Sequence, residues 1–130
     1  MEYIKWKEEL SVNNTQIDNQ HKELFRLINE FYNGVVNQTG KSAMSKVIYD
    51  LEAYVITHFK TEEEKMERAG YDLIKEHKAE HAKFIETVAD FRKRFNDGRL
   101  LLSLEVTAFI KNWITDHISQ TDQQYKGKIW

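Results

Sequence analysis

Hydrophobic residues recur every three or four positions along most of the chain, which is the spacing of one face of an α-helix. The pattern divides into four segments separated by short stretches rich in glycine and asparagine. The first segment covers about residues 19–37, with Asp18 as the expected N-cap. Residues 37–40 form the first expected turn, Gly70 ends the second segment, and residues 96–98 turn the chain after the third. The chain contains no proline, so these helices can run long.

Each segment gathers its hydrophobic residues on one face, and four such faces predict an all-α, up-down-up-down four-helix bundle. We expect one domain, with residues 1–17 as an N-terminal arm, 18–122 as the bundle and 123–130 as a C-terminal tail. Trp6 and Trp130 are candidate packing anchors for these two ends. The four faces are Leu24, Leu27, Ile28, Phe31 and Val35; Met44, Val47, Ile48, Leu51, Val55, His58, Glu62 and Met66; Ile74, His77, His81, Phe84, Val88, Phe91 and Phe95; and Val106, Phe109, Ile110, Trp113 and His117.

Composition and charge exclude several classes of function. The formal net charge is -2 and the basic residues are mixed with acidic ones, so we expect no nucleic-acid partner. The N-terminus has no hydrophobic leader, and no run is long enough to cross a membrane, which favours a cytoplasmic protein without membrane insertion. No extra hydrophobic face is visible, so a monomer is expected. The chain has no cysteine, and any metal must therefore be bound by nitrogen and oxygen.

The five histidines lie at alternating ends of the four segments. His21 is early in the first, His58 is late in the second, His77 and His81 are early in the third, and His117 is late in the fourth. In an up-down-up-down bundle these ends meet at one pole. Two carboxylates, Glu62 and Asp122, follow His58 and His117 at near-helical spacing. Because unpaired imidazoles and carboxylates are costly to bury, the pattern predicts a buried site for two metal ions.

Taken separately, these motifs have ordinary explanations. A histidine pair four residues apart is more often a surface or core pair than a metal site, and Glu62 belongs to an acidic run, residues 62–64, in which Glu63 lies off the hydrophobic face. Residues 77–81 also match the His-x-x-Glu-His pattern of inverted zinc peptidases. However, Glu80 points roughly 100° away from each flanking histidine direction, and it is expected to be a solvent-side charge.

The residues around these histidines resemble a known family. Residues 17–25, 58–62, 77–81 and 117–122 are similar to the corresponding segments of the hemerythrins, in particular the single-domain bacteriohemerythrins. The resemblance covers nearly the whole chain. It implies reversible dioxygen binding for storage, transport or sensing, without enzymatic turnover, and it admits an oxygen-consuming enzyme as a partner.

The resemblance also implies a role for each site residue. One iron would be held by His77, His81 and His117, and the other by His21 and His58. Glu62 and Asp122 would bridge the two non-haem irons together with an oxo or hydroxo group. The walls of the oxygen pocket would be Leu24, Phe59, Phe84, Trp113, Ile114 and Ile118, although ordinary core packing explains most of these side chains equally well.

Two other functions stay open at this point. The same centre could serve an enzyme that reduces dioxygen, peroxide or nitric oxide, or a protein that handles iron. The histidines could also be coincidental features of an interaction bundle. Against an oxygen-splitting enzyme, the chain has no Glu-x-x-His motif, which the carboxylate-rich di-iron bundles use. Five imidazoles and two carboxylates should favour binding dioxygen over cleaving it.

Overall fold

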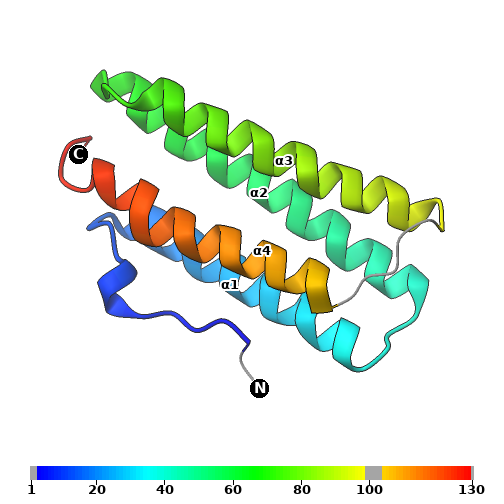
Figure 1. The fold of residues 1–130 in the computed structure, drawn as a ribbon. Helices are drawn as coiled ribbons and strands as arrows, with labels where there is room; N and C mark the ends of the chain where they lie inside the picture. The colour runs from blue at the N-terminus through cyan, green and yellow to red at the C-terminus, as the bar shows by residue number, and fades with distance from the viewer. Residues whose placement is uncertain (1–2, 99–103, 130) are drawn as a thin grey trace.

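The computed structural model describes residues 3–98 and 104–129 of the chain, and these residues form four α-helices without strands (Figure 1). The helices are α1 (Thr15–Val36), α2 (Lys41–Ala69), α3 (Ile74–Asn96) and α4 (Leu104–Asp116). Successive helices run in opposite directions, with α2 and α3 packed side by side above α1 and α4 in the view of Figure 1. The predicted all-α, up-down-up-down bundle is therefore confirmed.

The start of α1 differs from the prediction by four residues. Its N-cap is Asn14, which has an extended backbone and whose side chain accepts a hydrogen bond from the Ile17 N–H at 3.0 Å. Asp18 lies inside the first turn instead. Its carboxylate accepts hydrogen bonds from the Ser11 hydroxyl at 2.6 Å and the Val12 N–H at 3.0 Å. Asp18 therefore holds the incoming chain against the helix rather than beginning the helix.

The ends of α2 and α3 follow the predicted turn residues. Gly70 ends α2 in the left-handed conformation, at φ 65° and ψ 39°, where a side chain would be strained. Residues 37–40 connect α1 to α2, and α3 ends at Asn96. These short connections place the start of α1, the end of α2, the start of α3 and the end of α4 at the same pole of the bundle.

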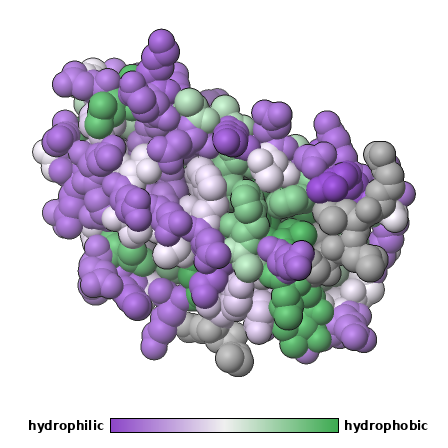
Figure 2. Space-filling view, viewed as in Figure 1, coloured by the Kyte–Doolittle hydropathy of each residue, from purple (hydrophilic) through white to green (hydrophobic). Residues whose placement is uncertain are grey.

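Most residues of the four hydrophobic faces meet in one core, which holds side chains such as Ile28, Phe31, Ile48 and Val88. Met66 and Ile74 belong to a second, smaller cluster beside Tyr125. Phe109 is an exception to the predicted fourth face, because 40 % of its surface is exposed; its ring lies edge to face with that of Phe91, with ring centroids 5.7 Å apart. Figure 2 shows mostly hydrophilic side chains on this side of the molecule, with a hydrophobic band across its middle. Among the described residues, no helix is long and hydrophobic enough to cross a membrane.

The N-terminal arm lies along the bundle. The Asn29 side chain on α1 accepts hydrogen bonds from the backbone N–H groups of Tyr3 and Ile4, at 2.7 and 2.8 Å. Trp6 packs against the core beside Phe25, as expected of an anchor. The arm also contacts the C-terminal segment, because the Gln123 side chain donates to the Leu10 carbonyl at 3.0 Å. Trp130, the other predicted anchor, lies outside the described residues.

Candidate metal centre

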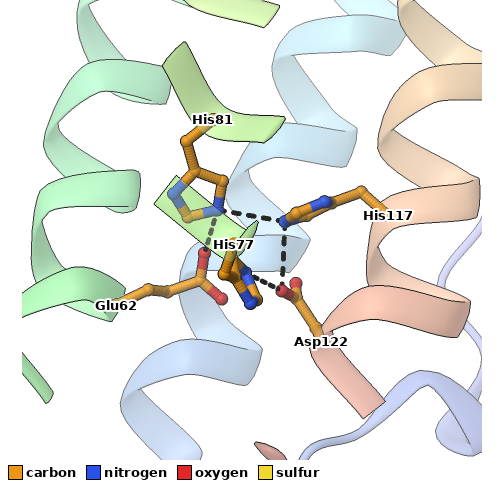
Figure 3. Close-up of side chains that lie close together, drawn as sticks. All are labelled: Glu62, His77, His81, His117 and Asp122. Atoms are coloured by element: carbon orange, nitrogen blue, oxygen red, sulfur yellow. Dashed lines mark hydrogen bonds and ion pairs between the residues drawn. The ribbon is translucent and has the colours of Figure 1, made fainter. Parts of the chain in front are cut away.

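The structure brings together all seven residues that the sequence pattern singled out, at the pole where the helix ends converge. None of them exposes more than 3 % of its surface. Three helices and the turns after the fourth supply them: His21 is on α1, His58 and Glu62 on α2, His77 and His81 on α3, and His117 and Asp122 in the π and 3₁₀ turns that follow α4. Figure 3 shows five of them pointing toward a common centre.

The two carboxylates lie between the imidazoles. Asp122 Oδ1 is 2.9 Å from His77 Nε2 and 3.1 Å from His117 Nε2, while its Oδ2 is 3.2 Å from His21 Nε2. Glu62 Oε1 is 3.2 Å from His58 Nε2 and 3.5 Å from His81 Nε2. The potential ligand atoms form two groups that share Glu62: Glu62, His77, His81, His117 and Asp122, and His21, His58 and Glu62. Each carboxylate thus contacts imidazoles that belong to both sides of the cluster.

The local helix geometry explains why paired residues face the same way. His58 and Glu62 on α2, and His77 and His81 on α3, are four residues apart and therefore share a helix face. His117 and Asp122 are five apart, a spacing that would separate their directions in an ordinary α-helix. Residues 117–121 form a π-helical turn, in which the Asp122 N–H donates to the His117 carbonyl. The wider turn brings this last pair to the same side.

Several atoms that face the centre approach one another at ion-pair distances but make no hydrogen bond of suitable geometry with any described residue. They are His21 Nε2, His77 Nε2, Glu62 Oε1 and both carboxylate oxygens of Asp122. Such orphaned polar atoms are costly in a buried site. Imidazole nitrogens and carboxylate oxygens with free lone pairs are suitable ligands for a first-row transition metal. The residues present therefore fit a metal site.

The pKa shifts of the buried groups also fit a metal site. Burial alone would raise the pKa of the Asp122 carboxyl, but His117, His21 and His77 lower this pKa well below its usual range. Burial likewise would raise the pKa of Glu62, and neighbouring imidazoles lower it. For His21 and His117 burial lowers the pKa, but the adjacent Asp122 and Glu62 outweigh this effect and raise it to about 9. The neighbouring imidazoles thus favour the ionised form of both carboxylates despite their burial.

Comparison with known proteins agrees with this geometry. Residues 12–129 match the family model described as the hemerythrin HHE cation binding domain. The chain belongs to the hemerythrin family. It is 35 % identical to the bacteriohemerythrin of Pseudomonas aeruginosa, over 99 % of this chain and 83 % of that protein. It is 34 % identical to the bacteriohemerythrin of Methylococcus capsulatus, over 83 % of this chain and 82 % of that protein. The crystal structure of a wild-type hemerythrin superposes with a TM-score of 0.93 at 31 % identity, covering 98 % of both chains.

Three imidazoles in this hemerythrin site have a hydrogen-bond partner on the side away from the centre. His58 Nδ1 lies 2.7 Å from the Gln20 Oε1, His81 Nδ1 lies 2.8 Å from a Glu63 carboxylate oxygen, and His117 Nδ1 lies 3.1 Å from a Glu80 carboxylate oxygen. Glu80 is exposed to solvent, as expected, but its carboxylate also contacts His117, which the sequence pattern did not predict. Glu63 lies off the hydrophobic face, as expected, but its side chain reaches across to α3. Such outer contacts fix which ring nitrogen faces a metal.

Aromatic rings cover the part of the hemerythrin site that holds His77, His81 and His117, called here the three-histidine side; His21 and His58 form the two-histidine side. Phe59 stacks on His81 with ring centroids 3.7 Å apart, and Trp113 stacks on His117 at 4.6 Å. Phe84 in turn stacks on Trp113 at 4.1 Å. Of the six predicted wall residues, Trp113 is partly buried and the others are fully buried: Leu24, Phe59, Phe84, Ile114 and Ile118. This packing keeps bulk water away from the cluster.

Tyr125 is a site residue that the sequence pattern did not identify, because it lies in the segment expected to be a tail. Its side chain is fully buried, its hydroxyl donates a hydrogen bond to Glu62 Oε2, and its ring stacks on His77 at 5.6 Å. The available signal was its position three residues after Asp122, in the 3₁₀ turn Asp122–Tyr125. Tyr125 thus orients the carboxylate that both ligand groups share.

We expect Tyr125→Phe to lower the free energy of unfolding of the metal-free protein by about 1–3 kcal/mol, because a buried carboxylate oxygen loses its donor. Tyr71→Phe is a matched control, since Tyr71 is a buried neighbour of Tyr125 whose hydroxyl has no partner among the described residues. Urea denaturation followed by circular dichroism measures both. Equal stabilities of the two variants would contradict an orienting role for Tyr125.

Proposed function

We propose that this chain binds dioxygen reversibly at a pair of non-haem iron ions held by its seven buried imidazoles and carboxylates. The observation that carries the proposal is the position of Glu62 and Asp122 between the other ligand-type residues, which suits two cations bridged by two carboxylates. The names of the bacteriohemerythrin relatives add support. The iron pair, when bound, would supply the redox-active centre to which dioxygen binds.

The proposed division of ligands follows the two groups in the structure. His77, His81 and His117 would hold one iron, and His21 and His58 would hold the other. Glu62 and Asp122 would bridge them together with an oxo or hydroxo group. The second iron would have one histidine fewer, which would leave room for an external ligand beside it. We propose that this position is where dioxygen is accepted.

The surrounding side chains favour reversible binding of dioxygen over its chemical conversion. A reversible carrier needs a centre shielded from water and from external reductants. The stacked rings of Phe59, Phe84 and Trp113 and the buried Leu24 provide such shielding. We therefore propose a non-enzymatic role in oxygen storage, transport or sensing.

The experiment is to measure iron per chain and to follow the visible spectrum of the reduced protein. The spectrum is recorded without oxygen, after exposure to air, and again after oxygen is removed. We expect about two iron ions per chain and an absorption band that appears with oxygen and disappears without it. Irreversible conversion to a ferric product would instead indicate a di-iron enzyme. Absence of iron would leave an interaction bundle with coincidental histidines.

A further inference from the structure

The imidazoles on the two sides of the cluster differ in the charge of their outer partners. On the three-histidine side, His81 and His117 each face a carboxylate, Glu63 and Glu80 respectively. On the two-histidine side, His58 faces only the neutral amide oxygen of Gln20. The other imidazole on the two-histidine side, His21, has a buried Nδ1 without a hydrogen-bond partner among the described residues. Both anionic outer partners therefore lie on the same side of the centre.

The Glu80 carboxylate contacts the Thr121 hydroxyl as well as the His117 imidazole. The Thr121 hydroxyl lies 3.1 and 3.3 Å from the two oxygens of Glu80 and donates to this carboxylate. Thr121 belongs to the same π-helical turn as His117, so the turn positions both the imidazole and the hydroxyl that fixes its partner. The Glu63 side chain is 27 % exposed and that of Glu80 is 46 % exposed, so both outer carboxylates are partly in contact with solvent.

A carboxylate that accepts the outer N–H of an imidazole makes the inner nitrogen a stronger electron donor, whereas a neutral amide does so less. The negative charge of the outer partner also stabilises a cation on the inner side. These effects add to the difference in ligand number, since five potential ligands lie on the three-histidine side and three on the other, with Glu62 shared. The charge of the outer partners and the number of ligands thus both favour the position of His77, His81 and His117.

We propose that Glu63 and Glu80 make the position of His77, His81 and His117 the one that takes up metal first and holds it more tightly. The position of His21 and His58, with Gln20 behind it, then fills second and releases its metal first. This inference rests on the proposed function, because it requires two metal positions. Glu63, Glu80 and Gln20 are then positioning residues that set the difference in metal affinity between the two positions.

The test uses Co²⁺, titrated into the metal-free protein under argon in competition with a chelator. We expect two binding steps for the unaltered protein. Glu63→Gln combined with Glu80→Gln should weaken the first step by about 10- to 100-fold, the range typical of outer contacts to metal ligands, and leave the second nearly unchanged. Glu64→Gln is the control, because Glu64 is an exposed neighbour of Glu63 on α2 and its change removes one negative charge, as each of the two replacements does.

The converse change should act on the other position. Gln20→Glu places a carboxylate behind His58 and should tighten the second step. In the Co²⁺ protein, the paramagnetically shifted N–H signals of His81 and His117 should move in the glutamine variants, and the signal of His58 should move in Gln20→Glu. Loss of stability alone would not produce this selective pattern. Thr121→Val, which frees Glu80 without removing its charge, should have an intermediate effect on the first step.

Three outcomes would overturn the inference: a first step in the double variant that stays within about twofold of the Glu64→Gln control, a weakening of both steps by equal factors, or a Gln20→Glu effect on the first step. Helical content measured by circular dichroism shows whether each variant is folded. If the double variant is not folded, the two single variants are titrated in its place.

If the unaltered protein binds fewer than two Co²⁺ ions, the proposed function fails too. If it binds two ions in indistinguishable steps, while the iron protein binds dioxygen reversibly, only this inference fails.

Discussion

Asp122→Asn should reduce the bound iron from about two ions per chain to less than one. Asp122 is fully buried and its oxygens lie within 3.2 Å of nitrogens of His21, His77 and His117, so it contacts imidazoles of both ligand groups. An asparagine has nearly the same shape, but it lacks the negative charge that balances two cations. The loss should therefore affect both metal positions. Iron content measured after anaerobic reconstitution and desalting gives the result.

Asp116→Asn is the matched control for this change. Asp116 is an exposed aspartate at the end of α4, and its removal alters the net charge by the same amount. The control should keep its full iron content. If the two variants retain equal amounts of iron, Asp122 is not a bridging ligand and the proposed centre is wrong. Circular dichroism of both metal-free variants tests whether the bundle itself is intact.

Leu24→Ser should speed the oxidation of the oxygenated protein in air by about tenfold or more, because a small polar side chain admits water next to the centre. Leu24 exposes 1 % of its surface and lies one turn after His21 on α1. The same change removes a buried leucine, so the free energy of unfolding should fall by about 2–5 kcal/mol. The decay of the oxygenated absorption band measures the oxidation rate.

The comparison for Leu24→Ser is Ile56→Ser on α2, which replaces a side chain that is 45 % exposed. This control should oxidise at the rate of the unaltered protein. If Leu24→Ser oxidises at that same rate while it remains folded and loaded with iron, Leu24 does not shield the centre. Its burial would then serve only the packing of the core.

The sequence was sufficient to predict where the buried polar residues meet, because helix periodicity sets the direction in which each side chain leaves its helix. His58 and Glu62 extend the hydrophobic face of α2, and His77 and His81 interrupt that of α3. Alternating helix directions then require these residues to lie at one pole. A separate signal, the glycine at position 70, correctly marks the end of α2.

Periodicity does not give the reach of long side chains that leave a helix beside its buried face. Glu63 and Glu80 each follow or precede a site residue by one position, yet both contact imidazoles of neighbouring helices. Periodicity does not predict Tyr125 as a site residue either, because the regular helical pattern ends before it, where the backbone changes to π and 3₁₀ turns. Asp18 and Asn14 are both good N-cap residues, and only the contacts of the arm distinguish them.

The position of the centre at one pole leaves the other pole free for protein engineering. The turn at residues 37–40 is exposed and belongs to the far end of the bundle, about 22 Å from His21 if α1 rises 1.5 Å per residue. A β-carbon added at Gly40 would meet no atom within 4 Å. Loop tips of this kind tolerate inserted domains better than packed segments. A reporter module spliced into this turn would therefore sit far from the buried cluster, and the bundle would act as a rigid spacer between the two.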